Sequence, residues 1–171
     1  SGPLNYNSAL TIGLVDTQFH IRTDHHLTDR DMATVRVSRN NNDQEYIINR
    51  FGGPYIPGFS LPNPEKTING TIGYLRTFSA QLVNDFRVGV NRYSNDLANG
   101  DQTTPSEVGL PNGNEIANGM PSVAFAASAA EPLGGLDWFN REQNEMTSMV
   151  SDAVSYLAGR HSFKFGGEFT R

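Results

Sequence analysis

The sequence Gly159-Arg160-His161-Ser162-Phe163-Lys164-Phe165-Gly166-Gly167-Glu168-Phe169 begins with a turn signal and continues as an alternating run. Successive side chains of an extended strand point to opposite faces. One face of this segment is aromatic and contains Phe163, Phe165 and Phe169. The other face is polar or small and contains Lys164, Gly166, Glu168 and Thr170. The stretch therefore predicts a two-faced β-strand over residues 161–171.

The same alternation recurs in five earlier segments, at residues 17–27, 32–40, 67–77, 82–93 and 143–157. It is clearest in the fourth of these segments, where Phe86, Val88 and Val90 alternate with polar residues or glycine. A helical period can also be fitted to residues 137–155, although strand alternation describes most of that segment as well. Together the six segments predict an all-β fold of antiparallel hairpins.

Short and long connections follow one another along the chain. Short turns at residues 27–31, 78–81 and 158–160 join the strands of each hairpin. Two much longer connections, at residues 41–66 and 94–140, join successive hairpins. Connections beyond about 12 to 15 residues are uncommon in compact domains unless they are functional. Short turns on one side and long loops on the other, with strands of about 9 to 11 residues in the membrane, are typical of a transmembrane β-barrel.

The composition of the 171 residues agrees with this interpretation without proving it. Hydrophobic residues make up 37% of the chain and the mean hydropathy is −0.46, which suits polar loops and strands with one apolar face. The net charge of −5, with no basic run in the sequence, argues against nucleic acid or anionic lipid headgroups as the main partner. The chain has no cysteine and no apolar run long enough for a membrane helix. Because the sequence starts without a signal peptide, we expect a processed protein or a piece of a longer one.

In a barrel, the polar faces of the strands line the lumen and the apolar faces meet lipid. The side chains predicted to face the lumen are Arg22, Asp24, Arg36, Asp85, Arg87, Lys164 and Glu168. Those predicted to face lipid are Phe19, Val35, Phe86, Val88 and Phe163. A soluble sheet alternates in the same way, so the pattern alone does not identify the solvent.

The sequence predicts neither a metal site nor a catalytic site, and no cofactor. Only His20, Asp24, His25 and His26 form a cluster of metal-ligand types. His20 and His26 are about 20 Å apart along an extended strand, whereas one zinc ion needs ligands about 2 Å away. We therefore interpret the cluster as part of a polar row. No nucleophile or metalloprotease motif occurs, so we expect a protein that is not an enzyme.

The two long connections contain aromatic residues that suit contacts with a ligand. The glycine-rich run at residues 51–59 lacks the lysine and hydroxyl residue of a phosphate-binding loop, and no helix follows it. Its aromatic residues instead suit an external loop. The candidates for ligand contact are Phe51, Tyr55, Phe59 and Trp138.

Several stretches, taken in order, resemble the β-barrel domain of Oar-like TonB-dependent outer-membrane receptors. The resemblance covers nearly the whole chain, and each stretch is weakly specific by itself. The matching stretches are FHIRTDHHL at residues 19–27, VRVS at 35–38, TFSAQLVNDFRVGVNR at 77–92, GMP at 119–121 and GRHSFKFGGE at 159–168.

This resemblance implies a large barrel, usually of 22 strands, in the outer membrane of a Gram-negative bacterium. It implies outer-membrane lipid, a plug domain and the other barrel strands as partners, and a TonB-type complex that energises passage of a ligand. The chain departs from the family pattern because we find no plug, no partner box and no final strand with an aromatic end. Six strands are also fewer than the eight or so of the smallest closed barrel. We therefore expect an excerpt of the receptor barrel.

Two alternatives use the same pattern of strands. The first is an extracellular or surface subunit, structural or adhesive, that assembles through open strand edges. The second is a soluble β-sandwich binding module, whose shared core would contain Phe86, Val88, Val90, Phe163 and Phe165.

Overall fold

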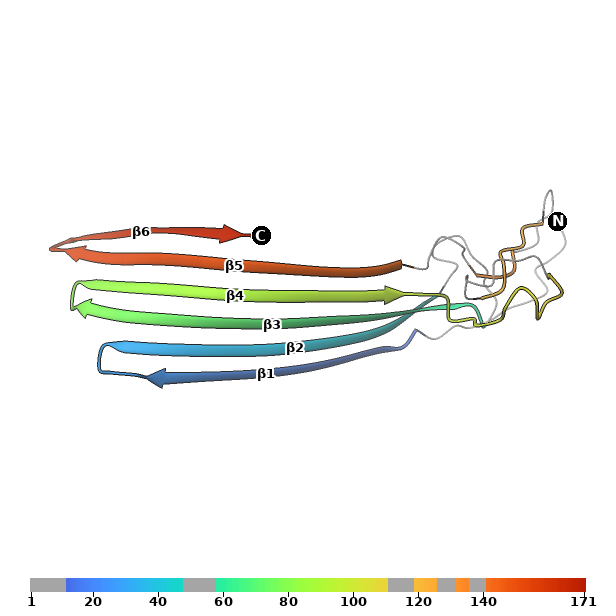
Figure 1. Cartoon of the computed structure of the whole chain (residues 1–171), viewed down its shortest axis with the longest axis horizontal. Coiled ribbons are helices and arrows are strands. Elements are labelled where there is room, and N and C mark those ends of the chain that lie inside the picture. The colour runs from blue at the N-terminus through green and yellow to red at the C-terminus, as the bar shows by residue number, and fades with distance from the viewer. Residues whose placement is uncertain (1–11, 48–57, 111–118, 126–131, 136–140) are drawn as a thin grey trace. The chain divides into compact units, whose positions relative to one another are not determined.

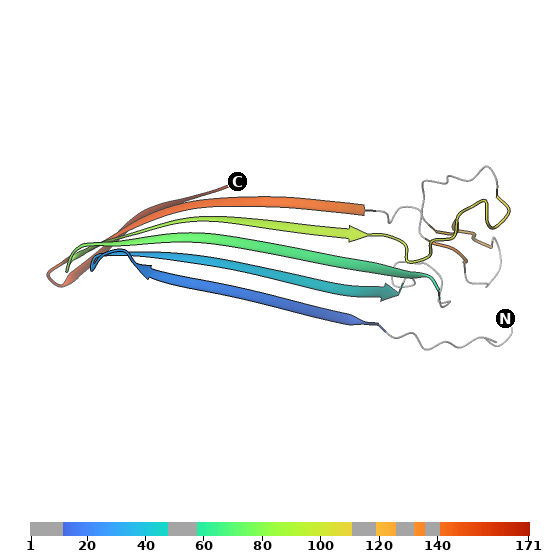
Figure 2. The same ribbon diagram turned by 60° about the horizontal axis from the view of Figure 1, so that its bottom comes forward.

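One antiparallel sheet contains all six strands, which follow one another in chain order from β1 to β6 (Figures 1 and 2). The computed structural model describes residues 12–47, 58–110, 119–125, 132–135 and 141–171. The predicted all-β fold of six antiparallel strands is confirmed. Because β1 and β6 occupy the two ends of this order, they are the edge strands of the described sheet.

The six strands are joined in pairs by short turns at residues 27–30, 80–81 and 159–160. Gly159 adopts a φ of 61°, a left-handed conformation that glycine tolerates best. The helical alternative is wrong from Arg141 onward, because a strand begins at that residue. The strands are β1 (Leu14–His26), β2 (Asp31–Ile47), β3 (Ser60–Ser79), β4 (Leu82–Leu97), β5 (Arg141–Ala158) and β6 (His161–Thr170).

The strands extend further into the long connections than the sequence indicated. Residues 41–47, 60–66 and 94–97 belong to strands, so the predicted connections 41–66 and 94–140 are too wide. Asparagine and proline made these ends resemble loops. Pro62 and Pro64 are two residues apart, however, so the N–H groups that they lack would point toward the same neighbouring strand. The strand can keep its hydrogen bonds to the neighbouring strand on the other side, because these bonds require no N–H group from Pro62 or Pro64. The strand therefore continues through both prolines.

The chain divides into two compact units. The first comprises Ser1–Asp16, Asn41–Glu65 and Asn95–Gln143. The second comprises Thr17–Asn40, Lys66–Ser94 and Asn144–Arg171. All three short turns belong to the second unit, and both long connections belong to the first.

In the second unit, cross-strand contacts define two faces of the sheet. A Cβ atom on Gly73 would lie 3.8 Å from the Cβ of Thr34 and 3.9 Å from the Cγ of Arg87, so these three residues share a face. The hydroxyl of Thr34 donates to Asp24 Oδ1 at 2.7 Å, which adds β1 to the same face. We call this the polar face. The opposite face, which we call the apolar face, carries alternate residues such as Val35, Ile72 and Val88.

The hairpin of β5 and β6 continues the apolar face through directly opposed pairs. Tyr156 lies opposite Phe163, and Val154 lies opposite Phe165. Such aromatic and β-branched pairs stabilise a sheet by about 0.2 to 1 kcal/mol each relative to alanine. The polar face of the same hairpin pairs Ser155 with Lys164.

The first unit contains a small hydrophobic cluster. Leu61 is fully buried, and Tyr46, Phe59 and Leu97 pack against it. Leu61 is the only buried residue among the described hydrophobic side chains. A soluble domain of this length would bury far more apolar surface. The β-sandwich alternative is therefore wrong for the described residues, and its expected core is exposed at Phe86, Val88, Val90, Phe163 and Phe165.

The register of β5 and β6 predicts which engineered disulfide forms. Ser151 lies opposite Glu168, so cysteines at these two positions should oxidise readily in the folded sheet. The chain has no cysteine of its own, so the new bond is identified without ambiguity. Cysteines at Ser151 and Lys164 are offset by four residues, about 13 Å, and should stay reduced. Mass spectrometry after mild oxidation shows whether a disulfide bond forms in each of the two double-cysteine variants. A bond in the offset pair but not in the opposed pair would contradict the register.

Candidate functional site

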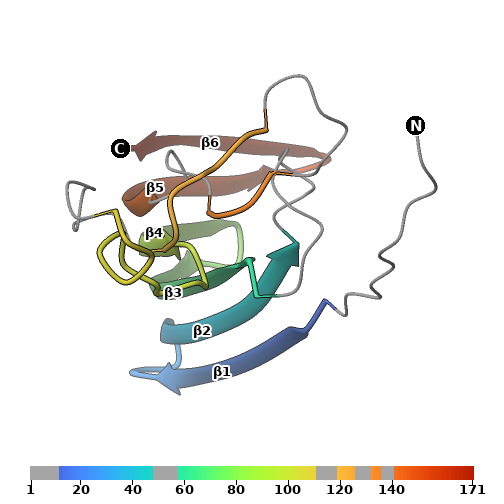
Figure 3. The ribbon, with the colours of Figure 1, turned by 90° about the vertical axis from the view of Figure 1, so that its right-hand side faces the viewer.

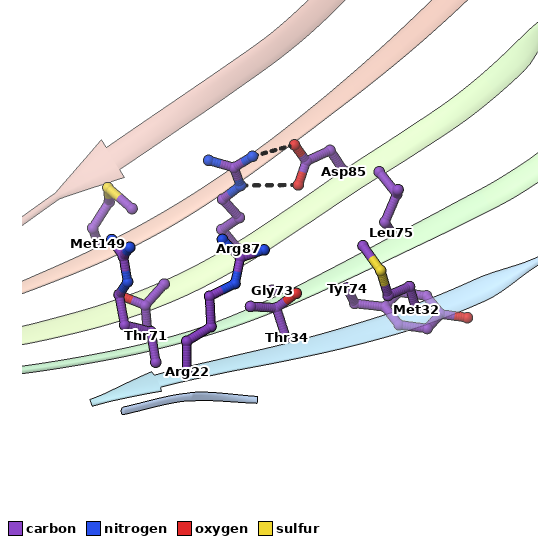
Figure 4. Close-up of a pocket in the computed structure, with 11 residues that line it drawn as sticks. Arg22, Met32, Thr34, Thr71, Gly73, Tyr74, Leu75, Asp85, Arg87 and Met149 are labelled. Atoms are coloured by element: carbon purple, nitrogen blue, oxygen red, sulfur yellow. Dashed lines mark hydrogen bonds and ion pairs between the residues drawn. The ribbon is translucent and has the colours of Figure 1, made fainter. Parts of the chain in front are cut away.

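The polar face of the second unit contains a hollow of about 440 Å³. It lies over β2, β3 and β4, with Arg22 of β1 and Met149 of β5 at its margins (Figure 4). Gly73 lies in its floor. Arginine, methionine and threonine residues line the rest, together with Tyr74, Leu75 and Asp85.

Two glycines explain why the sheet is hollow here. Gly73 and Gly89 lie on the polar face of adjacent strands, and neither projects a side chain. A Cβ on Gly89 would meet Thr71 Oγ1 at 3.6 Å and the terminal methyl of Met149 at 3.8 Å. These are ordinary contact distances, so a methyl group fits at either glycine and only a larger side chain would fill the hollow.

Ion pairs hold two of the arginine side chains around the hollow. Arg87 donates to both carboxylate oxygens of Asp85, at 2.6 and 3.0 Å (Figure 4). Arg22 is paired with Asp24 at 2.9 Å, and Asp24 also accepts a hydrogen bond from Thr34. Each pair joins residues two apart on one strand, so the charges are balanced locally. Because these side chains are exposed to solvent, the ion pairs contribute little to the stability of the fold. Their main effect is to orient the charged side chains.

The structure places all seven side chains that were predicted to face the lumen on the polar face. Arg22, Arg36, Asp85 and Arg87 line the hollow. Asp24 is hydrogen bonded at its edge. Lys164 and Glu168 lie opposite Ser155 and Ser151, on the same side of the hairpin as Met149. Such a charged, hydrated surface suits contact with polar solutes or with another polar surface.

The charged groups do not form a metal centre. Within the described ranges, no group of three or more histidine, cysteine, aspartate or glutamate side chains could hold a metal ion. In the same ranges, no helix is long and apolar enough to span a membrane.

A polar cluster at the turn end of the apolar face was not predicted from the sequence. Tyr74 Oη donates to Asp31 Oδ1 at 2.6 Å, and Arg76 lies 3.7 Å from the same oxygen. The guanidinium of Arg76 lies 5.1 Å from the centre of the Phe78 ring. The sequence did contain a signal for this cluster. Tyr74 lies two residues from Arg76, on a strand face that is otherwise mostly apolar.

On the next strands, Asn84 donates to Asp152 Oδ1 at 2.5 Å. Asp152 lies opposite Gly167 and between Val150 and Val154 on the apolar face. The apolar face therefore carries polar side chains toward the turn end in β2, β3, β4 and β5.

The described part of the connection after β4 is organised around Asp101. Its carboxylate accepts hydrogen bonds from the N–H and hydroxyl of Thr103 and from the N–H of Met120. Burial alone would raise the pKa of Asp101, but these hydrogen bonds outweigh it and lower the pKa below its ordinary value of 3.8. An aspartate whose side chain accepts a hydrogen bond from the backbone N–H two residues later is a common turn motif. The sequence could therefore have predicted the contact between Asp101 and Thr103, but not the contact between Asp101 and Met120.

Glycines allow the same connection to pack closely. Val123 and Leu133 form a β-bridge, and Gly135 N–H donates to the carbonyl of Met120 at 2.8 Å. Gly134 has a φ of 94° and lies against the carbonyl of Pro121, where a Cβ would overlap it. Residues 98–110, 119–125 and 132–135 lie together in yellow and orange in Figure 3.

One of the four predicted ligand-contact residues is described. Phe59 packs against Leu61, so part of its ring supports the hydrophobic cluster of the first unit. Phe51 and Tyr55 lie in residues 48–57, and Trp138 lies in residues 136–140, which are outside the described residues.

Acid should release the clasp at Asp101. A carboxylate with a lowered folded pKa contributes stability above its unfolded pKa and loses that contribution as pH falls through the folded pKa. The amide signals of Thr103 and Met120 should therefore titrate together with a midpoint below pH 3.8. Asp101→Asn should reduce the hydrogen-exchange protection of both amides at neutral pH.

Glu107→Gln is the matched control, because Glu107 accepts from the N–H and hydroxyl of Thr104 and not from Met120. It should leave the Met120 amide protected. A Met120 amide that is insensitive to Asp101→Asn contradicts the clasp.

Comparison with known proteins gives one match. The profile of the family described as "Outer membrane beta barrel domain" matches residues 1–171, the whole chain. No curated protein matched the chain, and no solved structure matched it.

Proposed function

The chain belongs to the outer membrane beta barrel domain family, and we propose that it forms wall and external loops of an Oar-like TonB-dependent receptor. Membership of this family indicates the bacterial outer membrane as its location. The proposed activity is energy-coupled passage of a ligand across that membrane, without enzymatic chemistry. The resemblance of residues 19–27, 77–92 and 159–168 to such receptors supports the finer assignment.

The length of the uncharged strip on the apolar face carries this proposal. Thr34, Gly73 and Arg87 lie opposite one another. Counting three residues from each of these positions toward the short turns leads to Asp31, Arg76 and Asn84. They form a polar row on the apolar face. Counting five residues from the same positions toward the long connections leads to a second row on the apolar face, which consists of Arg39, Ile68 and Arg92.

No charged side chain lies on the apolar face of β2, β3 and β4 between these two rows. The rows are eight residues apart, which is about 26 Å along a strand. With the strand tilt of about 40° usual in membrane barrels, this becomes about 20 Å of height, close to the apolar band of about 25 Å.

The exposure of apolar side chains supports lipid as the solvent of the apolar face. Ile72 is 60% exposed, Phe165 66% and Phe169 68%. Exposing so much apolar surface to water is unfavourable, whereas lipid tails solvate it. We therefore assign the lipid-facing role to Phe19, Val35, Phe86, Val88 and Phe163, and the lumen-facing role to the polar face.

The two edge strands imply additional strands. Within a bilayer, unpaired backbone N–H and C=O groups cost several kcal/mol each, so membrane sheets close into barrels. β1 and β6 end the described sheet, and we propose that other strands of the receptor pair with them. The polar face would then meet the lumen and a plug domain, while a TonB-type complex supplies energy through the receptor.

The long connections provide the external surface in this proposal. The Asp101 clasp and the close packing at Gly134 make part of the second connection a preformed structure. A preformed loop loses little conformational entropy on binding a ligand. Phe51, Tyr55, Phe59 and Trp138 remain the proposed ligand contacts.

A second candidate is an extracellular or surface structural subunit that assembles through strand edges. The open edges at β1 and β6 favour it. Detergent dependence separates the two candidates. A receptor barrel stays folded and dispersed only in detergent or lipid, whereas a secreted subunit is soluble or polymeric without either.

An arginine on each face of β4 tests which face meets lipid. Val88→Arg should destabilise the folded barrel in phospholipid vesicles by about 2 to 4 kcal/mol, because it places a charge near the bilayer midplane. Asn91→Arg, on the polar face of the same strand, should change the free energy of unfolding by less than about 0.5 kcal/mol. Guanidinium titration measures both values. Equal effects of the two substitutions would exclude the assignment of faces.

Energy coupling is tested in cells that produce the receptor containing this chain. Accumulation of its ligand should stop when a protonophore dissipates the inner-membrane proton gradient, while surface binding persists. Accumulation that is unaffected by the protonophore argues for a passive channel.

A further inference from the structure

Arg36 lines the hollow of the polar face and makes no ion pair with any described residue. The other two arginines of the lining, Arg22 and Arg87, each hold a carboxylate of their own strand, at 2.9 and 2.6 Å. If Asp24 at its edge is included, the hollow has three arginines and two carboxylates. Within the described residues, the charge of Arg36 therefore has no counter-ion.

The register of β1 and β2 places a second cation directly opposite Arg36. Leu27 N–H donates to the carbonyl of Asp31 at 2.9 Å, and counting five residues from each leads to Arg22 and Arg36. The backbone hydrogen bond at the other end of these two strands has the same register. Like charges directly opposite each other destabilise a sheet, so an anion beside Arg36 would relieve a repulsion.

Asp24 is the nearest carboxylate on this face, but it already counters Arg22. It lies diagonal to Arg36, at about 7 to 8 Å between Cα atoms. Arg22 donates to both of its carboxylate oxygens, and Thr34 donates to Oδ1 at 2.7 Å. One carboxylate cannot neutralise two arginines, so an excess positive charge remains at Arg36.

The other carboxylates of the polar face are further from Arg36. Asp85 is held by Arg87 and lies two strands and four residues away, which is about 16 Å along the sheet. In the second unit the remaining two, each about 20 Å away by the same spacing, are Glu145 and Glu168. The first unit adds two, six residues further along β1 and β3, at Asp16 and Glu65.

A row of small or flexible side chains leads from Arg36 across the floor of the hollow. Thr71 of β3 lies opposite Arg36, and Gly89 of β4 lies opposite Thr71. Met149 of β5 reaches over Gly89, since its terminal methyl would lie 3.8 Å from a Cβ atom there. The row therefore has a cation at one end, a thioether at the other and open space above Gly89.

We propose that the hollow binds a small organic anion, whose carboxylate pairs with Arg36 and whose apolar body lies over Gly73 and Gly89 against Met149. A guanidinium can bind a carboxylate through two parallel hydrogen bonds, and methionine adapts to the shape of a ligand and contacts aromatic rings favourably. The volume of about 440 Å³ lies within the range of small-molecule sites, roughly 300 to 1,000 Å³. The inference rests on the proposed function, because the polar face must line a lumen that solutes can enter.

Methyl NMR of methionine tests the proposal in the detergent-folded receptor that contains this chain, with 4-phenylbutanoate as the probe. The Met149 signal should shift as the probe is added, because the phenyl ring lies against its methyl group. Met120 in the connection after β4 and Met146 on the apolar face should not respond. An unchanged Met149 signal overturns the proposal. A shift at Met146 as large as that at Met149 would identify partition of the probe into detergent and would also overturn it.

Related probes separate charge from shape without any change to the protein. The neutral 4-phenylbutanamide has the same body and should bind at least about tenfold more weakly, because it cannot form a charge-assisted hydrogen bond with Arg36. Acetate has the charge without the body and should also bind more weakly. Equal binding of the amide and the carboxylate overturns the proposal. Displacement of 4-phenylbutanoate by equimolar sodium phosphate would identify a site for inorganic anions and contradict it.

Substitutions at Arg36 test the source of the charge. Arg36→Gln should weaken binding of 4-phenylbutanoate at least about tenfold, whereas Arg36→Lys keeps the charge and should retain most of the binding. Arg160→Gln is the matched control, because it removes the same charge in the turn between β5 and β6. It should bind the probe as the unmodified receptor does. An equal loss in Arg160→Gln would assign the binding to net charge and overturn the proposal.

A second pair of variants tests the hollow without changing any charge. Gly73→Leu places a side chain in the floor and should prevent binding. Gly70→Leu is the control on the same strand, where nothing lies within 4 Å of an added Cβ atom on the opposite face. Binding that survives Gly73→Leu contradicts the proposal. A receptor that inserts into vesicles but does not bind the probe refutes this inference alone, and a protein that never inserts refutes the proposed function.

Discussion

The pairing of backbone N–H and C=O groups between strands is the constraint on which the rest of this protein depends. Lipid offers no hydrogen bonds, so a chain in a bilayer must satisfy its backbone internally. Strand ladders do this for β2 to β5 on both sides and leave the edges of β1 and β6 to other strands. Because the ladder stabilises the sheet without a conventional core, side chains such as Ile72 and Phe165 can remain exposed. The small cluster around Leu61 belongs to the first unit and not to the uncharged strip of the apolar face.

Charge is separated both by face and by height along the strands. On the polar face, two of the arginines beside the hollow pair with a carboxylate on their own strand, Arg87 with Asp85 and Arg22 with Asp24. On the apolar face of β2, β3 and β4, no charged side chain lies between the row at Asp31 and the row at Arg39. The turn end mixes signs at Asp31 and Arg76, and at the connection end Arg39 and Arg92 are followed on the same face by Asp43 and Asp96.

The connection after β4 shows how a long polar segment gains a defined structure without a hydrophobic core. Hydrogen bonds to Asp101 hold Thr103 and Met120 together, and the absence of a side chain at Gly134 lets the backbone approach Pro121. Its asparagine-rich and glycine-rich composition resembled an irregular loop. The same composition supplies the turns and close contacts that order it, which is why composition alone underestimated its structure.

Alternation in single strands was sufficient to predict the all-β fold, the three hairpins and the face on which Phe86, Arg87 and Phe163 lie, because the period of two is a local property of extended backbone. The helical alternative for residues 137–155 failed where it conflicted with that period. Strand ends were harder, since Pro62 and Asn41 resemble loop residues until a neighbouring strand pairs with them. The hollow beside Gly73 and the Asp31–Tyr74 contact depend on register between strands. Register is set by cross-strand contacts among residues far apart in the chain, so only the tertiary structure decided them.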